Sequence, residues 1–134
     1  MDNCFFCKMA KGEVPSNTVY EDDDFRVILD IAPANPGHCL IIPKAHAMNI
    51  YEIDPELLSK AAVVAQKIAK KVKAATGCDG VNILQNNEEA AGQSVFHFHI
   101  HVIPRYKDDK KFIYKTMTQT HEELSAMRDA IIKA

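Results

Sequence analysis

The apolar positions along this chain follow two periods, which predict five strands and three helices. Apolar residues at alternate positions, or in short unbroken runs, predict strands at residues 18–21, 25–30, 38–43, 81–85 and 95–103. The first two strands form a hairpin over a turn at residues 22–24, and Pro43 closes the third. Because short turns link most of the strands and the helices stand apart, the predicted fold class is α+β with an antiparallel sheet.

The strongest helical pattern begins after residue 54. Asp54 is the predicted N-cap, Pro55 occupies the first helical position and Gly77 ends the helix. A short helix is expected at residues 4–11. Another is expected from about residue 121, with one apolar face formed by Leu124, Met127, Ile131 and Ile132.

Three histidines alternate with apolar residues near the end of the last predicted strand. A strand would place His97, His99 and His101 on one face and Phe96, Phe98, Ile100 and Val102 on the other. Three imidazoles in a row add nothing to packing, so they must be solvated or partnered. Strand geometry separates the outer two Cα atoms by roughly 13 Å, too far for all three rings to bind one zinc ion. We therefore expect separate roles along one edge of a pocket.

Length and charge narrow the class of protein. The chain has 134 residues, enough for one compact domain, with the motifs within about residues 4–105 and a helical tail at 106–134. A net charge of −2 gives no general attraction to nucleic acid. The sequence contains neither an apolar run long enough to span a membrane nor a signal-peptide pattern, so the expected location is the cytoplasm.

Four cysteines suggest a metal rather than disulfides. Cys39 and Cys78 are expected to be small buried residues, since the cytoplasm is reducing. Cys4 and Cys7 form a CxxC pair that only three residues precede, whereas a redox dithiol follows a strand of a βαβ unit. Their spacing is typical of half of a tetrahedral zinc site, which needs two more ligands.

The run Gly-Gln-Ser-Val-Phe-His-Phe-His-Ile-His-Val-Ile at residues 92–103 resembles the signature of the histidine-triad (HIT) family of nucleotide hydrolases and transferases. Blocks at residues 20–23, 29–31, 36–38 and 42–46 resemble the family's other motifs, in the same order. The resemblance implies a HIT-like, five-stranded antiparallel sheet with two main helices. It also implies a small purine nucleotide as substrate, and a homodimer whose sheet continues between protomers with the helix from Pro55 at or near the interface.

The resemblance also implies a role for each matching catalytic residue. His99 is the expected nucleophile on the α-phosphorus, which gives a nucleotidyl-histidine intermediate. A neutral imidazole is a competent nucleophile near pH 7. His101 and His38 are expected to line the α-phosphate site, and Ser94 and Gln93 to bond the phosphate or the leaving group.

Substrate binding is expected to involve the neighbouring loop and the second strand. The loop that contains Gly92 would supply backbone donors, Asn86 would face the phosphate or ribose, and Asp30 would accept from the ribose hydroxyls. Ordinary alternatives remain open, because Asp30 at a strand end also suits a turn cap, and Ser94 and Asn86 suit a turn and a loop. The residues expected to line the base pocket, which are equally plausible as plain core, are Phe6, Ile28 and Leu29, with Phe5 and Ile31.

The resemblance completes the metal site. In microbial members with an N-terminal CxxC, the implied ligands correspond here to Cys4, Cys7, His46 and His97, and together they would hold one structural Zn²⁺ per chain. The alternative is that His46 is a surface histidine and that both cysteines are free thiols.

Three functions from different classes follow. The first is a hydrolase acting at the α-phosphate of nucleoside phosphoramidates or related nucleotide conjugates, with dinucleoside polyphosphates as the alternative substrates. The second is a metal-binding protein or metalloenzyme in which His97 and His99 share an ion with His38 or His46. The third is a nucleotide-binding module without turnover. Labelling by an α-labelled nucleotide distinguishes the first from the other two.

Overall fold

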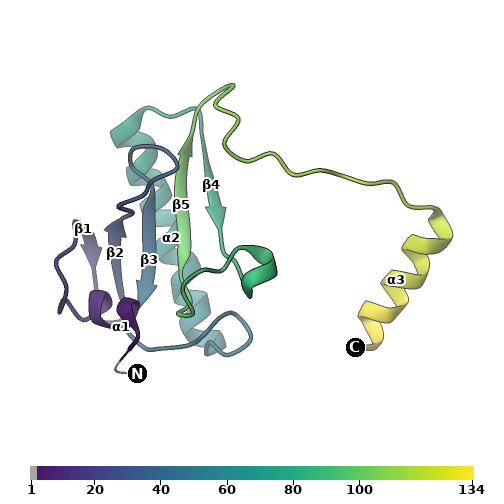
Figure 1. Ribbon diagram of the computed structural model, residues 1–134, viewed down its shortest axis with the longest axis horizontal. Coiled ribbons are helices and arrows are strands. Elements are labelled where there is room, and N and C mark those ends of the chain that lie inside the picture. Colours follow the sequence, from purple (N-terminus) through teal and green to yellow (C-terminus); the bar gives the residue numbers. More distant parts are fainter. Residues whose placement is uncertain (1–2) are drawn as a thin grey trace.

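A computed structural model of the chain describes residues 3–134. Figure 1 shows a sheet with the long helix α2 across one face, and the short helix α1 near the N-terminus. The elements in order are α1 (Phe5–Ala10), β1 (Thr18–Glu21), β2 (Phe25–Leu29), β3 (Cys39–Pro43), α2 (Pro55–Thr76), β4 (Gly80–Leu84), the 3-10 helix η1 (Glu89–Ala91), β5 (Ile100–Arg105) and α3 (His121–Lys133).

The sheet has five strands in the order β1-β2-β3-β5-β4, and every neighbouring pair is antiparallel. This confirms the predicted α+β class. His101 lies on the inner strand β5, where it pairs with Leu40 of β3 on one side and Leu84 of β4 on the other. The last histidine of the triad is therefore held at a fixed register in the middle of the sheet.

Helix α2 forms as its sequence predicts. The Asp54 carboxylate accepts from the backbone N–H of Glu56, and Gly77 ends the helix with a left-handed φ of 66°. Its buried stripe packs on the chain's own sheet, and consists of Ala61, Val64, Ala65, Ile68 and Val72. Within residues 3–134, neither α2 nor any other helix is long and apolar enough to cross a membrane.

The opposite face of the sheet carries α1. Phe6, Met9 and Ala10 of this helix pack against Ile28 of β2 and against Leu40 and Ile42 of β3. The alternate residues of these strands, Val27 and Ile41, join the core under α2 instead. Both sets are buried, which is why β3 reads as a continuous apolar run and β2 is interrupted only by Arg26.

The prediction of a strand at residues 95–103 is wrong at the start of the strand, because β5 begins only at Ile100. Before it, the Phe98 N–H donates to the carbonyl of Ala47 at 2.7 Å, and the His99 ring bonds to the carbonyl of His97. These contacts replace sheet pairing, so the strict alternation breaks down. Phe98 is buried as expected, whereas Phe96 is 49% exposed.

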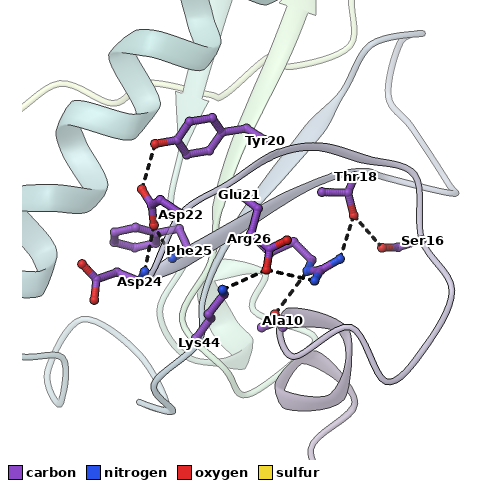
Figure 2. A network of polar contacts seen from close by, with 10 residues as sticks. All are labelled: Ala10, Ser16, Thr18, Tyr20, Glu21, Asp22, Asp24, Phe25, Arg26 and Lys44. Carbon is purple, nitrogen blue, oxygen red and sulfur yellow. Dashed lines mark hydrogen bonds and ion pairs between the residues drawn. The ribbon is translucent and has the colours of Figure 1, made fainter.

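A set of polar contacts joins the β1-β2 hairpin to its surroundings (Figure 2). Tyr20 donates to the Asp22 carboxylate, which also accepts two backbone N–H groups of the hairpin turn. Arg26 donates from Nε to the carbonyl of Ala10 at 3.2 Å and pairs with Glu21. The last residue of α1 is thereby tied to the sheet.

The predicted C-terminal helix is present as α3. Thr120 and Glu123 form a reciprocal capping box at its start. The helix lies away from the sheet at the end of an extended segment (Figure 1). The residues of its expected apolar face are all exposed: Leu124, Met127, Ile131 and Ile132.

Candidate active site and metal site

A pocket of about 410 Å³ opens on the face of the sheet that carries α1. Its polar end is formed by Asp30, Ser94, His99 and His101. The rest of its wall is mainly apolar and includes Phe5, Phe6 and Met9 of α1, Ile28 and Leu29 of β2, and Ile31, Leu40 and Val95. An apolar slot with a few polar groups at one end is typical of a small-ligand site.

His99 lies at this polar end with one free ring nitrogen. Its Nδ1 is 2.8 Å from the carbonyl oxygen of His97, and a carbonyl only accepts, so Nδ1 carries the proton and Nε2 keeps its lone pair. Burial lowers the pKa of His99 below its ordinary value of 6.5. The imidazole is therefore neutral at pH 7, with its nucleophilic nitrogen fixed in orientation.

His38 and His101 form a directed chain of hydrogen bonds behind the pocket. The backbone N–H of Ala34 donates to His38 Nδ1 at 3.0 Å, so the proton of neutral His38 is on Nε2. His38 Nε2 is 2.9 Å from His101 Nδ1, which must accept. His101 then carries its own proton on Nε2 and is a donor at its free nitrogen. Burial lowers the pKa of His101 to about 4, so this neutral tautomer prevails at pH 7.

Asp30 acts as a turn cap and also lies beside His38. One carboxylate oxygen accepts from the Ala32 N–H at 2.9 Å, as a turn cap does, while the other lies 3.6 Å from His38 Nε2. Asp30, His38 and His101 therefore converge as a possible ligand set for a metal. The proton on His38 Nε2 opposes that use, because a ligand nitrogen needs a lone pair.

The loop before the histidines is held by Gln93. This side chain is 2% exposed, donates to the carbonyls of Met48 and Val95, and accepts from the Glu88 N–H. Its amide is thus engaged with backbone groups rather than directed at a ligand. Gly92, with a φ of 95°, packs beside the Asn86 amide. Asn86 is not among the residues that line the pocket.

The four expected metal ligands converge at one point. The distances that involve His97 Nδ1 are 3.3 Å to Cys4 Sγ, 3.4 Å to Cys7 Sγ and 3.1 Å to His46 Nδ1. Cys7 Sγ also lies 3.3 Å from His46 Nδ1. In a zinc tetrahedron with Zn–S of about 2.3 Å and Zn–N of about 2.0 Å, ligand atoms are roughly 3.3–3.8 Å apart. The observed spacing therefore fits Zn²⁺.

The protonation of His97 also fits a metal ligand. Its Nε2 lies 2.8 Å from the Pro43 carbonyl and must donate there, which leaves a lone pair on the Nδ1 that faces the thiols. Burial lowers the pKa of His97 to about 4, and burial with the neighbouring Cys4 raises that of Cys7 to about 11. A divalent cation would supply the charge that stabilises the thiolates.

Sequence reasoning missed several parts of the pocket. Met9 and Leu40 belong to its apolar wall, and the spacing of Met9 from Phe5 and Phe6 along one helix is the one signal that indicates it. The three groups that fix histidine tautomers, which are the Ala34 N–H and the carbonyls of Pro43 and His97, are backbone groups that no side-chain pattern reveals.

Comparisons with known proteins agree on one family. The family model described as HIT domain matches residues 11–108. A crystal structure of a HIT family member from Bacillus subtilis is 41% identical, with a TM-score of 0.89 over 98% of this chain and 96% of that one. A zinc-bound histidine-triad protein from Mycobacterium smegmatis is 37% identical, with a TM-score of 0.78 over 98% of this chain and 95% of that one.

An enzyme is also among the relatives. The adenylylsulfatase HINT3 of Arabidopsis thaliana is 44% identical over 108 residues, which are 81% of this chain and 55% of that protein. The matching region includes most of the present chain, and the family model spans both the β1-β2 hairpin and the three histidines. The chain therefore belongs to the HIT family.

Proposed function

We propose that this protein hydrolyses nucleoside phosphoramidates, or related nucleotide conjugates, at the α-phosphate through a covalent intermediate on His99. The observation that carries the proposal is the tautomer of His99, whose Nδ1 proton is bound to the His97 carbonyl while Nε2 is free at the polar end of the pocket. The Arabidopsis relative is an adenylylsulfatase, which supports an adenylyl conjugate as the kind of substrate.

Each residue of the polar end has a task in this reaction. Asp30 would accept from the ribose hydroxyls, and the Nε2–H of His101 would donate to an oxygen of the α-phosphate. His99 Nε2 would form a bond to phosphorus as the bond from phosphorus to the leaving group breaks, and Ser94 would donate its hydroxyl proton to that group. Water then attacks the phosphorus atom as the phosphorus–nitrogen bond breaks, which releases the nucleotide and neutral His99, and the proton that this water loses returns to Ser94.

The charge around the pocket favours an amine over a polyphosphate as the leaving group. A hollow of about 420 Å³ beside Ser94 is lined by Glu89, Gly92, Gln93 and Phe96. Among the described residues that line this hollow and the pocket, none is a lysine or arginine. A polyphosphate leaving group needs positive partners of this kind, so dinucleoside polyphosphates are the second candidate.

We also propose one structural Zn²⁺ on Cys4, Cys7, His46 and His97. The convergent lone pairs support it, as does the zinc-bound relative from Mycobacterium smegmatis. Four protein ligands leave no open position for water or substrate. The metal would therefore stabilise the fold without taking part in the chemical step.

A homodimer is the proposed assembly. The strands β1 and β4 are the two edges of the sheet, and α3 presents an exposed apolar stripe. The buried stripe of α2 is satisfied within one chain, so it gives the dimer no support. A second copy that covers α3 or pairs with β4 would account for these open surfaces.

The proposed reaction is tested by trapping its intermediate. The protein is incubated with an adenosine phosphoramidate labelled at the α-phosphorus, then quenched at alkaline pH, where a phosphoramidate bond survives. Label bound to protein supports the proposed mechanism, and a nucleotide-binding module or metal-binding protein would give none. The His99→Ala variant is the matched control and should remain unlabelled.

A panel of substrates then identifies the leaving group. Adenosine and guanosine phosphoramidates are compared with diadenosine polyphosphates by kcat/KM. We expect the phosphoramidates to be preferred, because no cation lines the leaving-group side among the described residues. A preference for the polyphosphates would contradict that assignment while leaving the role of His99 intact.

A further inference from the structure

We propose that the metal-binding residues position helix α1 as a wall of the nucleotide pocket, so that metal occupancy sets the affinity for nucleotide while leaving the chemical step nearly unchanged. This inference rests on the proposed function and goes beyond a purely stabilising role for the metal. It follows from how α1 and His97 are each held in place.

Helix α1 cannot hold its position by itself. It has six residues, and a helix this short is unstable alone because few hydrogen bonds offset the cost of nucleation. It nevertheless supplies Phe5, Phe6 and Met9 to the pocket wall. Its placement must therefore come from its contacts with the rest of the chain.

The two ends of α1 have different attachments. At its end, the carbonyl of Ala10 accepts from Arg26 of β2 (Figure 2). At its start, Cys4 is the N-cap and Cys7 lies one turn later, and both thiols face His97. The end that carries Phe5 and Phe6 is thus the end that the metal site holds.

Phe6 connects this end of the helix to the nucleophile. Its ring centroid lies 5.0 Å from that of His99 in an edge-to-face arrangement, and 6.3 Å from that of His97. The side chain is 7% exposed and packs against Ile28 and Leu40. If the two thiols lose their shared metal, we expect this wall to loosen, which weakens the contacts with a bound nucleotide.

His97, by contrast, has anchors that need no metal. It is fully buried, its Nε2–H donates to the Pro43 carbonyl, and the next residue donates its N–H to Ala47. The carbonyl of His97 that orients His99 is therefore kept in place without the metal. Metal loss should raise KM and leave kcat nearly constant.

Calorimetry with AMP tests the inference on zinc-loaded protein, on protein stripped with a chelator, and on the Cys4→Ser/Cys7→Ser variant. We expect AMP to bind about tenfold more weakly or worse without metal, within the usual range of coupling between two sites. The kcat of stripped protein that retains its far-ultraviolet circular dichroism should stay within about threefold of the loaded value.

The Phe6→Ala variant tests whether α1 carries the coupling. In zinc-loaded protein this variant should bind AMP more weakly. Removal of the metal from the variant should reduce its AMP affinity little further, because both changes act on the same wall of the pocket. The matched control is Val64→Ala, a truncation in the core under α2, which should lower stability and keep the full effect of metal removal on AMP affinity.

The reciprocal effect of AMP on Zn²⁺ affinity provides a measurement that does not need stable metal-free protein. If metal strengthens AMP binding, saturating AMP must strengthen Zn²⁺ binding by the same factor, as measured by competition with a chelating dye. We expect that increase in the unsubstituted chain and expect Phe6→Ala to abolish most of it.

Three results would overturn the inference: AMP affinity within twofold with and without metal, a fall in kcat with unchanged KM, or full additivity of Phe6→Ala and metal removal. Failure of the proposed function would look different, since the zinc-loaded protein would then not turn over a phosphoramidate, whether or not it binds AMP.

Discussion

At the scale of single residues, backbone groups decide what the histidines can do. The His97 carbonyl fixes the proton of His99 on Nδ1, and the Ala34 N–H fixes that of His38 on Nε2. His99 thereby keeps a free lone pair on Nε2, as the proposed nucleophile needs, and His101 is left with a donor at its free nitrogen. Chemically identical side chains differ in tautomer because His38 and His99 are each bonded to a different backbone group, while His101 is bonded to the His38 ring.

Replacement of the nucleophile tests this assignment. We expect His99→Ala to lower kcat by at least about a thousandfold, because a covalent route is lost, while AMP binding and the far-ultraviolet circular dichroism persist. His121→Ala, which removes an exposed histidine of α3, is the control and should retain activity. A His99→Ala rate within about tenfold of the unsubstituted protein would refute the role of His99.

The pH dependence of the rate provides a second test. Burial lowers the pKa of His99 below 6.5, so the neutral nucleophile should persist into mildly acidic solution. We expect kcat/KM to decline on the acid side with an apparent pKa below 6.5. A decline centred at 6.5 or above would show that the nucleophile is not buried as described.

The free energy of unfolding should also decrease toward acid pH. The pKa of His101 is about 4 in the folded chain and about 6.5 when unfolded, and burial lowers those of His38 and His99 in the same direction. Between these values the unfolded state binds more protons, so the free energy of unfolding should fall as pH decreases from 6.5 to 4. Urea unfolding across this range measures it, and a free energy that rises toward acid pH would contradict it.

At the scale of elements, the proposed metal site would join a short helix to two segments far away in sequence. Cys4 and Cys7 belong to the start of α1, His46 follows β3, and His97 precedes β5. A metal ion bound by ligands from three segments would hold those segments together and so favour the folded chain over the unfolded one. This is how a six-residue helix can serve as part of a binding site.

We expect one equivalent of zinc per chain in protein purified without chelator. Cys4→Ser/Cys7→Ser should lose that zinc and unfold at a lower temperature, because metal binding contributes directly to folding. Elemental analysis and thermal unfolding provide the measurements. Cys78→Ala, whose thiol lies outside the metal cluster, should keep its zinc. Well under half an equivalent in the unsubstituted protein would argue against the site.

At the scale of the whole molecule, α3 stands out because it is formed but not packed. Its apolar residues are between 54% and 74% exposed, and its N-terminal cap is complete. A helix of 13 residues is marginal in water without packing, so a surface that covers it would stabilise it. A second copy of the chain is the proposed source of that surface.

Light scattering at micromolar concentration tests the homodimer. We expect a mass near twice the 15.0 kDa of one chain. Ile131→Asp, which places a charge in the exposed stripe of α3, should weaken association, whereas Glu122→Ala on the same helix should not. A mass near that of a single chain for the unsubstituted protein would reject the dimer.

The sequence by itself determined most elements, because their signals are local. The apolar runs of β2 and β3, the Asp54 cap and the Gly77 stop depend on near neighbours, and the structure has β2, β3 and α2 close to the predicted bounds. The spacing of the histidines also argued against one ion bound by all three, and the structure places His97 in the cluster of potential metal ligands and His99 in the pocket.

The tertiary structure alone decided the rest, because those features depend on contacts between distant residues. The start of β5, the engaged amide of Gln93 and the tautomers of His38 and His97 all follow from backbone groups elsewhere in the chain. The amphipathic period of α3 predicted a buried face, yet the face is open. A pattern shows which surface an element would bury, and only the folded chain shows whether anything covers it.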